Sequence, residues 1–237
     1  TVIQEAADFP PGWFVSDVPT ISHDDWLRRR DRGDFDPRKD VVIAPETYLS
    51  ILSDYAQDLP VVLFNQNGSY SFGLADSGQY WKPAAVLNRY QHASIVHVLC
   101  VSLSDRALLV NGFGLEGNRV SCIRNGLETE ECRPNGSKSL KMAVMPRKNP
   151  RDVAVVQALL RQQPWMKKWS LVDIQSRPHA EVIKLLQGCA LFLSFGHPEG
   201  FGLPVAEAMA CGCAVIGYSG LGGRELFQLG HQYGTAV

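Results

Sequence analysis

Residues 194–212 read SFGHPEGFGLPVAEAMACG and follow an apolar run, Ala190–Ser194, which predicts a buried strand. Pro204 suits the first position of a helix, where its missing N–H needs no partner, and Gly212 suits the cap that ends one. The stretch therefore predicts a strand, a glycine-containing loop and a helix over Pro204–Cys211. Such units build open α/β sheets, whose ligands bind beyond the carboxyl ends of the strands.

Two carboxylates frame this predicted crevice. Glu199 lies in the loop, and Glu207 lies in the first turn of the helix or just after it. Helical side chains lean toward the N-terminus of their helix, so we expect Glu207 to reach the crevice that Glu199 faces. An acidic residue in a first helical turn also stabilises the helix dipole by itself, which leaves a purely structural interpretation open.

The loop backbone is suited to phosphate. Gly200 and Gly202 flank Phe201 and allow N–H groups to approach a ligand closely. The helix start at Gly202–Leu203 adds partial positive charge. Carboxylates beside exposed amides suit a ligand that carries both hydroxyls and phosphates, such as a nucleotide sugar. Tight packing of the loop explains the same glycines without a ligand.

Short apolar runs alternate with amphipathic stretches along the rest of the chain, which predicts βα units and a parallel sheet. In the first half we expect strands over Val41–Ala44, Val61–Asn65, Val96–Val101 and Val120–Ile123, with helices over Thr47–Leu52 and Ser104–Val110. In the second half we expect strands over Lys141–Met145, Ser170–Ile174, Ala190–Ser194 and Cys213–Gly217, with helices over Arg151–Arg161, His179–Gln187 (capped by Gly188) and Pro204–Cys211.

A polar break over Glu128–Ser139 separates the two series. It predicts two Rossmann-like, doubly wound α/β domains, over residues 1–127 and 128–237. Each has fewer strands than the five or six of a typical doubly wound sheet, so we expect both domains to be partial.

Composition narrows the class of protein. The chain has 237 residues, 45% of them hydrophobic, and a formal net charge of -1. A nucleic-acid partner is not expected without a basic excess, and the basic run Arg28–Arg30 lies among aspartates, as on a solvated helix face. No stretch is long and apolar enough to span a bilayer, and the N-terminus lacks the features of a signal peptide. The six cysteines form no CxxC pair and no familiar zinc pattern. We expect free thiols in a cytoplasmic protein, with peripheral membrane contact left open.

The stretch from Leu191 to Glu225 closely resembles the C-terminal signature of the family-four (group 1) retaining glycosyltransferases, which have the two-domain GT-B fold. That signature is approximately EGFGLPxxEAMAxG followed by a GGxxE turn. The matching residues are Glu199-Gly200-Phe201-Gly202-Leu203-Pro204, Glu207-Ala208-Met209-Ala210, Gly212, Gly222-Gly223 and, one position early, Glu225.

The resemblance implies that the N-terminal domain, residues 1–127, serves the acceptor side and that the second domain, residues 128–237, binds the donor. It also implies residue roles. Glu199 would lie beside the donor sugar as the catalytic-site carboxylate, and Glu207 would hold the ribose hydroxyls. Basic residues after the first strand of the second domain bind the donor diphosphate in this family. Here Arg147 matches best, and Lys148 and Arg151 compete for the second position. The donor-binding set expected from the resemblance is Arg147, Lys148, Gly200, Phe201, Gly202, Leu203 and Glu207.

One departure concerns the acceptor side. Many relatives place a histidine at the end of a strand in the first domain, but the counterpart here, residues 64–68, reads FNQNG.

The resemblance implies transfer of a sugar from a nucleotide-sugar co-substrate, with retention of configuration and without a metal or other cofactor. The acceptor is left open between a carbohydrate, a lipid-linked molecule and others. Alternatives are another GT-B enzyme, such as a sugar-nucleotide epimerase or a glycogen-type synthase, and a non-catalytic nucleotide-sugar-binding fragment.

Overall fold

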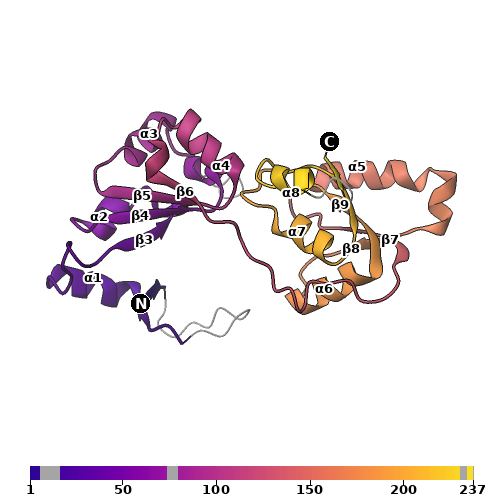
Figure 1. Cartoon of the computed structure of the whole chain (residues 1–237), viewed down its shortest axis with the longest axis horizontal. Coiled ribbons are helices and arrows are strands. Elements are labelled where there is room, and N and C mark those ends of the chain that lie inside the picture. Colours follow the sequence, from indigo (N-terminus) through magenta and orange to yellow (C-terminus); the bar gives the residue numbers. More distant parts are fainter. Residues whose placement is uncertain (6–16, 74–79, 230–233, 237) are drawn as a thin grey trace.

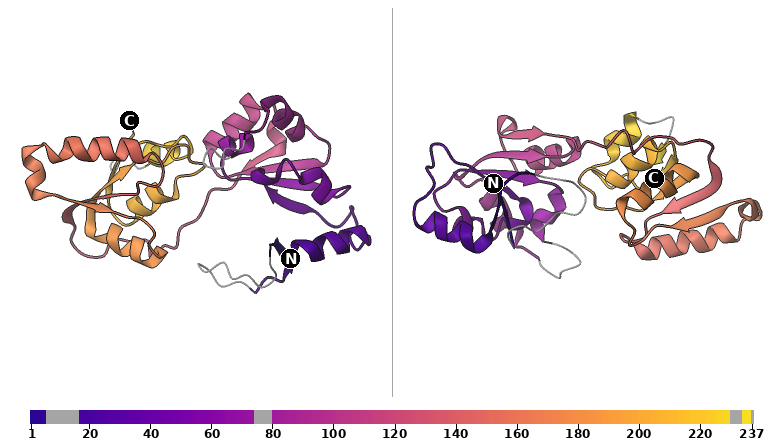
Figure 2. Two further views of the ribbon diagram at one scale, coloured as in Figure 1. Left: turned by 180° about the vertical axis from the view of Figure 1, so that it is seen from behind. Right: turned by 90° about the horizontal axis from the view of Figure 1, so that it is seen from below.

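The computed structural model describes residues 1–5, 17–73, 80–229 and 234–236. The described chain forms two α/β lobes that lie side by side (Figure 1), and the two further views show the same separation (Figure 2). We call residues 1–122 the first lobe, residues 123–138 the linker and residues 139–237 the second lobe. The two main sheets are separate and parallel, which confirms the predicted α/β fold class.

The main sheet of the first lobe has the order β3-β4-β5-β6, without a reversal of direction along the sheet. Its elements are β3 (Val42–Pro45), α2 (Leu52–Ala56), β4 (Val61–Asn65), α3 (Pro83–Tyr90), β5 (Ile95–Cys100), α4 (Leu103–Ala107) and β6 (Val120–Cys122). Strand β4 has the bounds expected from the sequence. The helix expected over residues 47–52 is wrong in part: a 3-10 turn, Glu46–Tyr48, is followed by a break before α2.

A small unit below β3 was not expected. Strands β1 (Val2–Gln4) and β2 (Thr20–Ser22) pair in parallel, and α1 (His23–Asp31) follows directly. Ser22 caps this helix by accepting a hydrogen bond from the N–H of Asp25. The basic run Arg28–Arg30 lies on α1 and pairs with neighbouring aspartates, as expected.

The second lobe contains β7 (Ser139–Val144), α5 (Pro150–Arg161), β8 (Ser170–Asp173), α6 (His179–Gly188), β9 (Cys189–Ser194), α7 (Leu203–Ala210), β10 (Ala214–Gly217), α8 (Arg224–Leu229) and β11 (Gly234–Ala236). The sheet order is β11-β10-β9-β7-β8. The chain therefore moves from β7 to β8 on one side and then crosses to β9 on the other side, so the strand order reverses between β7 and β9.

Side chains alternate across this sheet as the period of a strand requires. Ala143 and Phe192 pack with α6, α7 and α8 on one face. Val144 and Leu193 pack with α5 on the other. Two predicted helix ends need correction. Gly188 is the last residue of α6 rather than its cap, and Leu203 precedes Pro204 at the start of α7.

All six cysteines are free, and all but Cys122 are buried, as expected for structural thiols. Burial raises the pKa of the Cys100 thiol to about 12 and that of Cys211 to about 11. Such thiols stay protonated and react slowly. Cys132 belongs to the linker and packs in the core of the second lobe, so the later part of the linker is anchored on that lobe.

Candidate functional site at the strand-order reversal

The candidate site lies where the order of the second sheet reverses. Loops that leave the carboxyl ends of β7, β9 and β10 meet there, and β9 is hydrogen-bonded to both of the other strands. Open α/β sheets bind ligands at such reversal points. The sequence places Arg147 and Lys148 on the first of these loops and Glu199 on the second.

A cavity of about 80 Å³ opens between these loops. Its lining includes Arg147, Lys148, Glu199 and Gly202 from the expected set, together with Tyr218 and Ser219 after β10. Small-molecule sites usually enclose roughly 300–1,000 Å³. The cavity in this structure is therefore smaller than the usual range for a small-molecule site.

Lys148 and Glu199 both line the cavity and form an ion pair with each other. Lys148 Nζ lies 3.0 Å from Glu199 Oε2, with only 17% and 20% of the two side chains exposed. The same ammonium donates a 2.7 Å hydrogen bond to the carbonyl of Pro198 and lies 5.7 Å from the ring centre of Tyr70 in the first lobe. Lys148 is thus already bonded, so an incoming phosphate must compete with Glu199 for it.

Arg147 is exposed and lines the cavity, and among the described residues it has no ion pair. Its guanidinium is free to meet an anion. Arg151 lies in the first turn of α5 and does not line this cavity. The sequence left Lys148 and Arg151 as alternatives, and the structure brings Lys148, not Arg151, to Glu199.

Asn149 fixes the β7 loop against the β9 loop. Its backbone is left-handed, with φ of 54°, a conformation that asparagine tolerates better than most residues. Its side-chain amide donates to the carbonyls of Phe195 and His197, at 2.8 and 3.1 Å. These bonds hold the two loops that carry Lys148 and Glu199 in one arrangement.

The glycine loop packs against the first lobe. A Cβ at Gly200 would overlap the carbonyl oxygen of Gln66, so the two backbones touch across the lobes. Gly202 has φ of 88° and precedes α7, a conformation that favours glycine. Phe201 is buried, whereas Leu203 is 39% exposed at the start of α7.

Glu207 lies apart from the cavity. It lies in the middle of α7, and its Oε1 atom is within hydrogen-bond distance, 3.0 Å, of Nε2 of His179 at the start of α6. Its side chain is 13% exposed. Glu207 is not among the residues that line this small cavity, so its expected reach toward the crevice that Glu199 faces stays a prediction.

Two buried carboxylates organise the facing loop of the first lobe, and the sequence analysis missed both. Glu46 accepts hydrogen bonds from the N–H groups of Gln66 and Asn67, and Asp105 accepts one from Gly68. Burial raises the pKa of both carboxyls, that of Asp105 to about 6. The Asn67 amide in turn donates to Pro198 at 3.3 Å.

One of the two acids carried a signal in the sequence. Ser102-x-x-Asp105 is a capping pattern, and the Ser102 hydroxyl does accept from the N–H of Asp105. No comparable sequence pattern marks Glu46.

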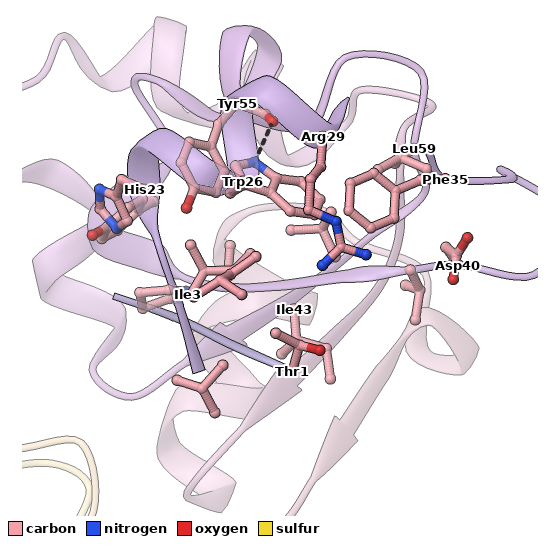
Figure 3. Close-up of a pocket in the computed structure, with 17 residues that line it drawn as sticks. Thr1, Ile3, His23, Trp26, Arg29, Phe35, Asp40, Ile43, Tyr55 and Leu59 are labelled. Carbon is pink, nitrogen blue, oxygen red and sulfur yellow. Dashed lines mark hydrogen bonds between the residues drawn. The ribbon is translucent and has the colours of Figure 1, made fainter. Parts of the chain in front are cut away.

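A larger cavity, of about 640 Å³, lies in the first lobe beside α1 and β3 (Figure 3). None of its lining residues belongs to the second lobe. Its lining is mainly apolar, and Arg29 is engaged with Asp34 at 3.6 Å and the Phe35 ring at 5.3 Å. Trp26 Nε1 donates to the carbonyl of Tyr55. This cavity lacks the converging polar groups of the β7–β9 site, which is therefore the better candidate despite its smaller volume.

Comparisons with known proteins bear on the family of the second lobe and on the fold. Residues 173–236 match the family model of glycosyl transferases group 1. An α-1,6-glucosyltransferase of Actinobacillus pleuropneumoniae serotype 7 (strain AP76) is 47% identical over 51 residues, which is 22% of this chain and 16% of that protein. The match therefore spans a small part of this relative.

Two solved structures share the architecture. Anabaena HepE in complex with UDP has a TM-score of 0.65 at 13% identity, with 93% of this chain and 72% of HepE covered. Sucrose-phosphate synthase from Thermosynechococcus elongatus has a TM-score of 0.62 at 11% identity, with 99% and 74% covered. At such identities the likeness shows the fold alone.

Within the described ranges, none of the helices has the length and apolar character needed to cross a membrane. The family match includes Glu199 and Glu207 and both neighbouring strands β9 and β10. Residues 173–236 thus match the group 1 glycosyltransferases, and the chain has the two-lobed GT-B fold of its structural neighbours.

Proposed function

We propose that the protein is a retaining glycosyltransferase that moves a sugar from a nucleotide-sugar donor to an acceptor. The observation that carries this proposal is the meeting of Arg147, Lys148 and Glu199 at the β7–β9 reversal, within a chain whose residues 173–236 match the group 1 family. A uridine diphosphate sugar is the first donor class to test, because the similar HepE structure holds UDP.

The basic residues would neutralise the leaving diphosphate. Negative charge grows on this group as the glycosidic bond to the donor breaks. Arg147 is free to bind it, and Lys148 can follow once the phosphate replaces Glu199 as its partner. The start of α7 adds the partial positive charge of a helix N-terminus. These groups make metal-independent transfer our proposal.

Glu199 would act on the sugar. Release from Lys148 leaves a partly buried carboxylate beside the forming oxocarbenium-like centre. Such a charge stabilises the transition state more than the bound donor, because the positive charge at the anomeric carbon develops only as the bond breaks. Retention follows if the acceptor attacks from the side of the leaving group and its proton passes to the departing phosphate.

Glu207 would hold the ribose hydroxyls, with His179 fixing the orientation of its carboxylate. The acceptor would approach from the first lobe, where the loop at Gln66–Gly68 faces Pro198 and Gly200. A carbohydrate and a lipid-linked molecule both remain acceptor classes for the test.

The test compares binding of UDP and uridine by calorimetry. Arg147→Ala should weaken UDP binding about tenfold or more and leave uridine binding nearly unchanged, since one charge-assisted contact to phosphate is lost. Arg161→Ala, at the far end of α5, is the matched control. Equal weakening of both ligands contradicts the diphosphate role.

Turnover separates the enzyme classes. Product analysis with UDP-sugars distinguishes transfer to an acceptor from epimerisation of the donor. Binding without any turnover by the full-length protein would favour the non-catalytic module.

A further inference from the structure

We propose that Glu225 and Arg124 form a latch between the lobes and are positioning residues for the transfer. By "latch" we mean the contact of the Glu225 carboxylate with Arg124 in the linker and with Leu103 in the first lobe. The effect on transfer rests on the proposed function, whereas the latch itself does not.

The contacts of Glu225 cross the lobes. Its Oε2 atom lies 2.8 Å from Arg124 Nε, two residues beyond the end of β6. Its Oε1 atom accepts a 3.3 Å hydrogen bond from the N–H of Leu103, at the start of α4. One carboxylate on the second lobe therefore bonds to both the linker and the first lobe.

Burial makes these contacts matter. The Glu225 side chain is 7% exposed, and that of Arg124 is 52% exposed. A nearly buried carboxylate that loses its partners keeps an uncompensated charge in a poorly hydrated place, so the closed arrangement depends on the pair. The half-exposed Arg124 regains water when the lobes separate, which makes opening reversible.

An apolar cluster surrounds the latch. Val101 and Phe64 of the first lobe pack with Phe201, Ala206 and Leu226 of the second lobe and Leu127 of the linker. Phe201 belongs to the glycine loop and Leu226 follows Glu225 directly. The cluster and the latch thus close the same interface.

The latch is mechanically joined to the Glu199 loop. The N–H of Glu199 donates to the carbonyl of Gly220, and the N–H of Gly222 donates to the carbonyl of Glu199, at 2.7 and 3.0 Å. A Cβ at Gly222 would overlap the carbonyl oxygen of Gly200, so the 220–222 turn packs directly against the glycine loop. The 220–222 turn leads into α8, which begins one residue before Glu225.

The cavity of about 80 Å³ is lined by the second lobe alone, and the glycine loop beside it either packs against the first lobe, as here, or is released when the lobes separate. The Gln66 carbonyl lies against Gly200, so opening separates the first lobe from the glycine loop. We infer that the latch sets the balance between these two states, and that it returns Glu199 to a fixed position against the first lobe.

The test uses Glu225→Gln, Arg124→Gln and the double variant of the whole chain. The amide at 225 keeps the size of the side chain and an acceptor for Leu103 but removes the charge. Arg124→Gln tests the same pair at a half-exposed position, in case the buried substitution impairs folding. Glu181→Gln is the matched control, because Glu181 pairs with Arg177 within α6 and its preceding loop.

Lobe opening is measured without ligand, by small-angle X-ray scattering and by hydrogen exchange of peptides that contain Leu103 and Gly222. We expect each latch variant to exchange about tenfold faster there and to have a larger radius of gyration, as for the loss of one charge-assisted bond. The double variant should change no more than the larger single change, and Glu181→Gln should match the wild type.

Turnover gives the second reading. The latch variants should lower kcat about tenfold while UDP affinity stays within about twofold, because the groups proposed to bind the diphosphate stay together in the second lobe. Wild-type scattering and exchange in both single variants would overturn the latch. If the variants open the lobes but no form of the protein binds UDP, the latch is supported and the proposed function fails.

Discussion

The substitution Asp105→Asn removes the ionisation of one buried carboxyl. Asp105 lies beside the first-lobe loop at Gln66–Gly68, which contacts the glycine loop. Asp105 is 6% exposed, its Oδ1 accepts from the N–H of Gly68, and its Oδ2 has no hydrogen-bond partner among the described residues. Burial raises its pKa from 3.8 to about 6. The folded protein therefore binds this proton more tightly than the unfolded chain does.

The sign and size follow from linkage. The stability that the protonated carboxyl contributes is fully present below the unfolded pKa of 3.8 and is lost as the pH rises through about 6. One pKa unit corresponds to about 1.4 kcal/mol, so the full change is about 3 kcal/mol, most of it between about pH 4 and pH 7. Asparagine cannot ionise and lacks this pH dependence.

Urea unfolding of both proteins across that pH range measures the effect. The free energy of unfolding of the wild type, minus that of Asp105→Asn, should fall by roughly 2–3 kcal/mol from about pH 4 to about pH 7. Asp25→Asn is a control that should change little over this range, because hydrogen bonds from Arg28 and Ser22 lower the pKa of Asp25 below its ordinary value of 3.8, so its pH dependence lies mainly at lower pH. A difference for Asp105→Asn that is flat, or that rises with pH, refutes the reasoning.

Two further substitutions test the ribose contact of Glu207 and the backbone strain at Leu221. Glu207→Gln should weaken UDP and uridine binding alike, by about 1 kcal/mol, because a charge-assisted bond to the ribose becomes a neutral one; calorimetry with unchanged uridine affinity would contradict the ribose role. Leu221→Gly should stabilise the fold by about 1 kcal/mol, because Leu221 has φ of 75°, which strains a branched side chain but not glycine; a lower free energy of unfolding for this variant would show that side-chain packing outweighs the strain.

Much of the second lobe was predictable because its signals are local. Apolar runs such as 190–194 and 213–217 are long enough to show a strand, and Pro204 and Gly212 mark the ends of α7. The rule that ligands bind at strand ends placed Glu199 at the predicted crevice, and Arg147 was added by the family resemblance. The elements β1, β2 and β11 have three residues each, too few for a periodic pattern.

The contacts between the lobes could not be read from the sequence in the same way. Arg124 and Glu225 are 101 residues apart, Leu103 and Glu225 are 122 apart, and Asn67 and Pro198 are 131 apart. Each partner alone resembles an ordinary surface or helix-end residue. The ion pair between Lys148 and Glu199 was not predicted, because each residue was assigned a contact with the donor and neither was considered as a partner of the other.

In the proposed function, Glu199 acts on the donor sugar during transfer. The most direct measurement is the turnover number of Glu199→Gln in the full-length protein, with UDP affinity and thermal midpoint determined on the same sample. The loss of one electrostatic contact to the transition state predicts a fall in turnover of roughly ten- to a thousandfold, with a folded protein and nearly unchanged UDP affinity. A folded Glu199→Gln protein with wild-type turnover would contradict the claim.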